Sequence, residues 1–221
     1  MSMSARIGVV LLGAAVVAAS AIAAPGDPER RDIRPADQAW AERATLRVRD
    51  VPAGYTATRR ASTRDNAPLT CPGFAPDLSD LTITGEALSP VFQNRAGTTI
   101  FSAAEVYRSL HDERESWRRT ARRAALRCVA RAMEQISAQG LRITVTSRLV
   151  RTPPPVGDRA ISFRIAAKVQ AQGVSVTAWF DVVGVARGRA DATLMISSVL
   201  RPPSAALERT LLATLDRRLK R

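Results

Sequence analysis

Regular alternation of apolar and polar residues in the second half of the chain restricts its fold more than any other feature. Ile161, Phe163 and Ile165 alternate with polar neighbours. A period of two is typical of a β-strand with one covered face, and the short turns at 172–173 and 187–190 join antiparallel strands. We therefore expect an antiparallel meander. The same period recurs in residues 141–149, 174–185 and 191–201.

Two more strands, at 81–89 and 98–108, and three helices are expected in the rest of the chain. Pro35 begins a short helix that ends near Ala44, and Ser204 caps a C-terminal helix with a leucine every four residues. A long helix is expected over about 112–139, closed by Gly140. Its apolar stripe lies opposite a solvated face formed by Arg119, Arg123, Arg127 and Arg131.

The N-terminus has the composition of an export signal. Arg6 precedes an apolar run, and small residues offer a cleavage site after Ala23. We expect a signal peptide at 1–23, with an uncleaved membrane anchor as the alternative. A flexible linker is expected at 24–35 and a single domain at 36–221, secreted or held in the cell envelope.

An exported chain with two cysteines is expected to oxidise them. Cys71 and Cys128 are predicted to form one disulfide, worth roughly 4 kcal/mol by restricting the unfolded chain. Two free buried thiols are the alternative. The expected fold is thus α+β: an antiparallel sheet of about five to seven strands, packed by a long central helix and a C-terminal helix, with one disulfide.

The net charge of +13 comes almost entirely from arginine. Such a field attracts anions, and outside the cytoplasm these are envelope components rather than nucleic acid. The expected partner is an unknown small molecule or an anionic envelope component, with membrane contact only through an uncleaved N-terminal segment. A plain solvated surface is the alternative.

No motif in the sequence indicates an enzyme, a metal site or a cofactor site. His111, the single histidine, lies beside Ser109 and Asp112 at a helix start, where capping explains the serine and aspartate better than a catalytic triad does. Three strand carboxylates could form the acid pair of a glycosidase, but ion pairing is the simpler explanation. They are Glu86, Glu105 and Asp181.

A basic face of the sheet is the predicted binding site. Five residues on neighbouring strands would hold an anionic ligand through arginine hydrogen bonds beside an aromatic ring. The prediction fails if Arg148 and Arg164 lie on opposite sides of the sheet, and a solvated β-face is the alternative. The five are Arg142, Arg148, Arg164, Lys168 and Trp179.

The order of landmarks resembles a known family. It comprises Gly54-Tyr55, the segment LTITGEALSPVF, the segment SAAEVYRS, a helix with the second cysteine, and FDVVGVARGRADATLMI before the leucine helix. These resemble actinobacterial secreted sensor-domain-like proteins, similar to the extracellular sensor domain of PknH-type serine/threonine kinases. The resemblance covers about residues 40–219 and implies an antiparallel sheet flanked by helices, with a ligand cleft. The chain departs from those kinases in lacking a kinase domain and in having one potential disulfide where two are expected.

The expected function is therefore an exported ligand-binding or sensor-like domain of the cell envelope. Two alternatives stay open. One is an envelope-directed hydrolase, and the other is a structural or interaction protein without a ligand pocket.

Overall fold

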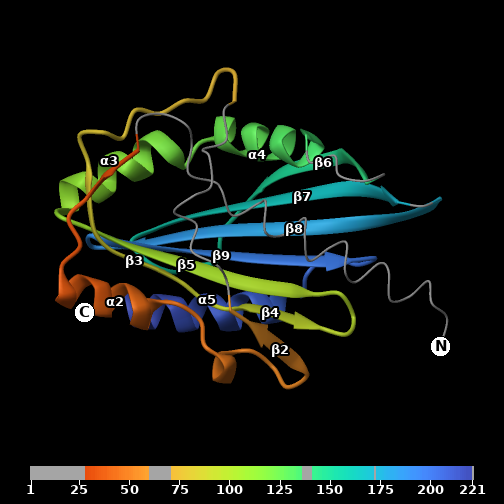
Figure 1. Ribbon diagram of the computed structural model, residues 1–221, viewed down its shortest axis with the longest axis horizontal. Coiled ribbons are helices and arrows are strands. Elements are labelled where there is room, and N and C mark those ends of the chain that lie inside the picture. Colours follow the sequence, from red (N-terminus) through yellow and green to blue (C-terminus); the bar gives the residue numbers. More distant parts are fainter. Residues whose placement is uncertain (1–27, 60–70, 136–140, 172, 221) are drawn as a thin grey trace.

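The computed structural model describes residues 28–59, 71–135, 141–171 and 173–220. They form an α+β fold in which helices pack on both faces of a mostly antiparallel sheet (Figure 1). The helices are α2 (Pro35–Ala44), α3 (Leu110–Thr120), α4 (Arg123–Gln135) and α5 (Ala205–Leu219), with a 3-10 turn, η1, at Val48–Asp50. The strands are β1 (Arg30–Arg31), β2 (Tyr55–Thr58), β3 (Thr82–Leu88), β4 (Val91–Asn94), β5 (Thr99–Tyr107), β6 (Arg142–Arg151), β7 (Arg159–Ala171), β8 (Val174–Arg187) and β9 (Ala190–Val199).

The meander predicted for the second half is confirmed as β6 to β9. Strand order in the sheet is β1-β3-β5-β9-β8-β7-β6, with β4 paired to β5 and β2 paired to β4. Nine strands are present in the described residues, rather than five to seven. Part of the excess is β4, which lies in the connection between the strands predicted at 81–89 and 98–108; it follows Ser89-Pro90 and, like β3, pairs with β5. Proline lacks the N–H that an unbroken strand would need there.

Each face of the sheet has its own hydrophobic core. The helix pair α3 and α4 covers one face, and α2 with α5 covers the other (Figure 1). Met133 of α4 packs with Phe163 and Ile165 on the first face. On the second face the leucine repeat of α5 is confirmed, because Leu211 and Leu215 are fully buried. The chain therefore builds two cores on one shared sheet.

The single long helix predicted over about 112–139 is instead two helices, α3 and α4. The chain leaves helical geometry at Ala121, whose ψ is 59°. The Thr120 hydroxyl donates to the Ser116 carbonyl at 2.8 Å, a bond that competes with regular helix geometry. The predicted solvated face holds in α4, where Arg123, Arg127 and Arg131 are exposed, and the expected closure at Gly140 lies outside the described residues.

Part of the expected linker is bound to the sheet. The predicted signal peptide, residues 1–23, lies outside the described residues. From Arg30 onward, however, backbone N–H groups donate to carbonyls of residues 81–84, and β1 pairs with β3 in parallel. The flexible linker predicted at 24–35 is therefore wrong for residues 30–34. No helix in the described part of the chain is both long and apolar enough to cross a membrane.

Candidate functional site

Four of the five residues predicted to form the basic site share one face of the sheet. Arg164 and Lys168 are four residues apart in β7, so their side chains point the same way. The strand register places Trp179 of β8 and Arg142 of β6 on that same side. This is the face on which α5 packs. Sequence periodicity was sufficient to bring these four residues together.

Arg148, in contrast, lies on the opposite face. A β-bulge between Val145 and Ser147 inserts one extra residue into β6. Beyond it, Arg148 lies opposite Ile165, whose side chain belongs to the core under α4. Because side chains alternate with a period of two, one inserted residue moves every later side chain of the strand to the opposite face of the sheet. The prediction of a five-residue site that includes both Arg148 and Arg164 is therefore wrong.

Arg164 belongs to a buried ion network. Its guanidinium donates two hydrogen bonds of 2.6 Å to Asp181, and Arg151 donates to Asp181 at 3.0 Å and to Glu208 at 2.8 and 3.1 Å. Both carboxylates are buried, and burial of a charge costs several kcal/mol unless it is paired. The network therefore joins β6, β7, β8 and α5. Asp181 already binds the Arg164 guanidinium, so Arg164 is not free to bind a ligand.

The two other cations on this face remain available. Arg142 and Lys168 are exposed, and neither forms an ion pair with a residue that the structure describes. Trp179 is half-buried, with the Arg164 guanidinium carbon 6.0 Å from its ring centroid, and its buried Nε1 has no hydrogen-bond partner among the described residues. An open cavity of about 320 Å³ lies beside Arg142. Its other lining residues are Glu134, Ile143 and Thr144.

A row of carboxylates crosses three neighbouring strands at the other end of the sheet order. Glu86 of β3 lies opposite Glu105 of β5, and Glu105 lies opposite Asp191 of β9. Arg31 of β1 donates to both carboxylate oxygens of Glu86 at 3.2 Å. Two of the three strand carboxylates singled out in the sequence are therefore neighbours, whereas Asp181 belongs to the ion network.

The surroundings of Glu105 and Asp191 favour the protonated form of these two carboxyls. Burial, together with the charge of Glu29, raises the pKa of Glu105 to about 7, although the Tyr107 hydroxyl donates to it at 2.8 Å. Burial and then the charge of Glu105 raise the pKa of Asp191 well above its ordinary value. The Tyr107 hydroxyl also lies 3.0 Å from that of Ser116 in α3. Glu105 can therefore take up a proton near neutral pH.

Little in the sequence indicated that an acidic residue of α3 would be buried against the sheet. Glu113 is fully buried and pairs with Arg159 at the start of β7, whose guanidinium carbon lies 5.8 Å from the Trp117 ring centroid. Burial raises the pKa of Glu113, and the hydrogen bond from Arg159 opposes that rise. The one available signal was the four-residue spacing of Glu113 and Trp117, which places both on one side of a helix.

The capping interpretation of the α3 start is confirmed. The Ser109 hydroxyl accepts the Asp112 N–H at 3.0 Å and donates to the Asp112 carboxylate at 2.6 Å. Asp112 also pairs with Arg108 at 3.2 Å, and His111 is exposed. Hydrogen bonding at the helix start thus accounts for the serine and aspartate. Among the described residues there is no group of three or more histidine, cysteine or acidic side chains that could hold a metal ion.

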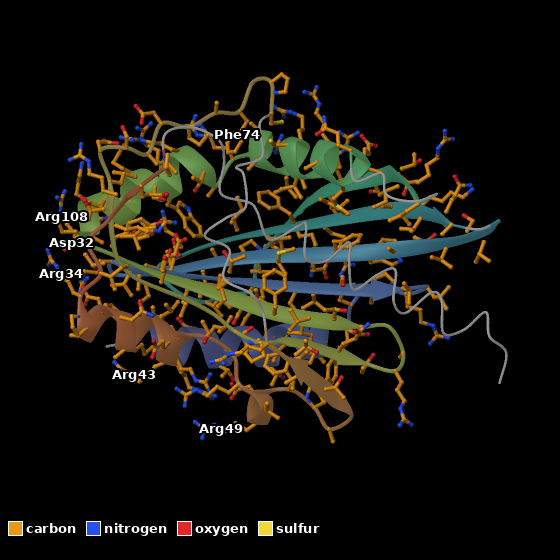
Figure 2. All side chains as sticks on the ribbon, viewed as in Figure 1. Asp32, Arg34, Arg43, Arg49, Phe74 and Arg108 are labelled. Atoms are coloured by element: carbon orange, nitrogen blue, oxygen red, sulfur yellow. The ribbon has the colours of Figure 1, made fainter. Side chains whose placement is uncertain are left out.

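The two cysteines meet but are not joined. Cys71 and Cys128 lie 2.6 Å apart as free, buried thiols, so the predicted disulfide is absent from this structure. Phe74, labelled beside α4 in Figure 2, packs with them and with Ala125. Burial and then the hydrogen bond with Cys71 raise the pKa of Cys128 to about 12. The predicted contact between the cysteine loop and the buried side of the helix is correct.

Comparison with known proteins gives no further guidance. No family model matches the chain. No curated protein matches it significantly either.

Proposed function

We propose that the chain is an exported ligand-binding or sensor-like domain of the cell envelope and that its ligand is anionic. The observation that carries the proposal is the pair Arg142 and Lys168, which are exposed on one face and form no ion pair within the described residues. Elsewhere in the fold many arginines pair with a carboxylate, as Arg164 and Arg151 do. Two unpaired cations on a shared face favour a bound anion.

The two cations would act differently on an anionic group. The planar fork of Arg142 can donate two parallel hydrogen bonds to a phosphate or carboxylate, and Lys168 supplies a compact charge. Trp179 lies on the same face, where its indole ring could pack against the body of a ligand. The cavity beside Arg142 offers space at the edge of β6, where the Glu134 carboxylate of α4 also lines it. The net charge of +13 would help to draw an anion toward the protein.

A hydrolase of envelope material remains the second candidate because of Glu105. A carboxyl with a pKa of about 7 beside another carboxylate suits a general acid at neutral pH. The cavity described above, however, lies at β6 and not at this row. Ligand binding is therefore the better supported function.

The test uses protein recovered from the culture medium of its host, which should begin at Ala24 if the leader is removed. Inorganic pyrophosphate is the probe, and its affinity is measured by calorimetry. Changing both Arg142 and Lys168 to alanine should weaken binding at least about tenfold, because each charge-assisted hydrogen bond contributes about 1.5–3 kcal/mol.

The matched control removes the same charge elsewhere. Arg43 of α2 and Arg49 of η1 are exposed and lie on the outer side of the molecule (Figure 2). Changing both to alanine should leave pyrophosphate affinity within about twofold of the original. Equal losses in the two double variants would show that net charge alone attracts the anion and would refute a site at Arg142 and Lys168.

A further inference from the structure

Strand β6 forms an edge of the sheet. Among the described residues β7 is its one strand partner, so the other side of β6 has no strand beside it. An unpaired edge presents backbone N–H and C=O groups that can pair with another chain. The bulge at Val145/Ser147 divides this edge into two halves with different surroundings.

The half before the bulge is protected. Ile143 is buried under α4, and the Glu134 carboxylate of that helix accepts the Val145 N–H at 3.0 Å. This side-chain acceptor occupies a position where an added strand would supply a carbonyl. The first half of β6 is therefore blocked by the fold itself.

The half after the bulge is open. All residues from Thr146 to Val150 are exposed, and the side chains of Leu149 and Val150, on opposite faces, are 52% and 41% exposed. The Val145 N–H points away from β7, and the alternation of an antiparallel ladder gives Arg148 and Val150 the same outward direction. An extended segment would therefore find outward backbone groups with an apolar side chain on each face.

The charge of β6 determines which kind of extended segment could pair with its edge. The strand has no acidic residue, and its outer half carries the exposed Arg148, whereas Arg151 is already paired with Asp181 and Glu208. A second copy of the chain, paired through the outer half of β6, would bring the Arg148 side chains of the two copies close together with no acidic residue on either strand beside them, which is unfavourable. We infer that the outer edge of residues 147–150 binds an extended, acidic segment of another protein by strand addition. This binding mode is separate from the anion site on the sheet face.

The probe for the test is a fluorescein-labelled peptide of eight residues in which glutamate alternates with valine and threonine. Its lysine counterpart is the control. Fluorescence anisotropy should show at least tenfold tighter binding of the acidic peptide. Amide hydrogen exchange at Arg148 and Val150 should slow when it binds, because those N–H groups gain acceptors.

Two variants separate backbone pairing from charge. Val150→Pro removes an outward N–H and should weaken binding of the acidic peptide at least tenfold, since an edge position tolerates proline where the N–H faces solvent. Arg148→Glu leaves the backbone intact and should reverse the preference between the two peptides. It remains informative if the proline variant does not fold.

Three results would overturn the inference. They are equal binding of both peptides, unchanged binding by the folded Val150→Pro variant, and exchange protection confined to residues outside β6. Sedimentation that showed a dimer, lost in Val150→Pro, without peptide binding would assign the edge to a second copy of this chain instead.

Discussion

Replacing Glu105 by glutamine should change how the stability of this protein depends on pH. The carboxyl lies between Glu86 and Asp191 on neighbouring strands and accepts the Tyr107 hydroxyl. Glutamine has nearly the same shape and its carbonyl oxygen can accept the same hydrogen bond. The variant therefore removes the titration of Glu105 while keeping its packing.

The sign and size of the effect follow from the pKa of Glu105, which burial and Glu29 raise from 4.5 to about 7 in the folded protein. Below pH 4.5 the carboxyl is protonated in both the folded and unfolded chains, so its contribution to stability is fully present. As pH rises to 7 and above, the unfolded chain ionises first and native stability falls. A difference of 2.5 pKa units, at about 1.4 kcal/mol each, corresponds to about 3.5 kcal/mol over the whole titration.

Urea unfolding at pH 5 and at pH 8 measures this effect, because urea carries no charge of its own. The gain in unfolding free energy of Glu105→Gln over the original chain should be larger at pH 8 than at pH 5 by about 2.5 kcal/mol, because the unfolded carboxyl is already partly ionised at pH 5. Asp32→Asn, which changes an exposed carboxylate paired with Arg34 (Figure 2), is the control and should give a gain that differs little between the two pH values. A Glu105→Gln gain that is the same at both pH values would refute the reasoning.

Two further predictions concern the ion network and the thiols. Replacing Arg151 by alanine leaves Asp181 and Glu208 without one of their buried partners and should lower the unfolding free energy by about 3–5 kcal/mol in urea; a loss under about 1 kcal/mol would show that water compensates for the missing guanidinium. Cys71 and Cys128 should not react with Ellman's reagent in the folded protein at pH 8, since both are buried and the pKa of Cys128 is about 12. Two thiols should react in guanidinium chloride, and a count of zero there would mean that the pair is oxidised.

The helix ends that the sequence predicted most accurately depend on local chemistry. Pro35 begins α2, and the Ser204 hydroxyl accepts the Leu207 N–H at the start of α5. Neither feature needs a distant contact, because proline fixes its own φ and a cap bonds within three residues. The break between α3 and α4 was missed because Ala121 and the residues around it carry no strong helix-breaking signal.

The candidate site shows where periodicity ceases to be sufficient. Alternation placed Arg142, Arg164, Lys168 and Trp179 on one face correctly. It failed for Arg148, since the bulge in β6 depends on how β6 and β7 pair and leaves no mark in the spacing of residues. Alternation also could not show that Arg164 would form an ion pair with Asp181, because an ion pair depends on which strands become neighbours.

The sequence by itself determined the α+β class, the meander and the helix caps, because these depend on the period of apolar residues and on bonds between near neighbours. Tertiary structure alone decided that Glu86, Glu105 and Asp191 lie side by side. β9 is far from β3 and β5 in the chain, and only the order of strands in the sheet brings Asp191 beside Glu105. The raised pKa of Glu105 follows from that adjacency and from burial, neither of which a linear pattern contains.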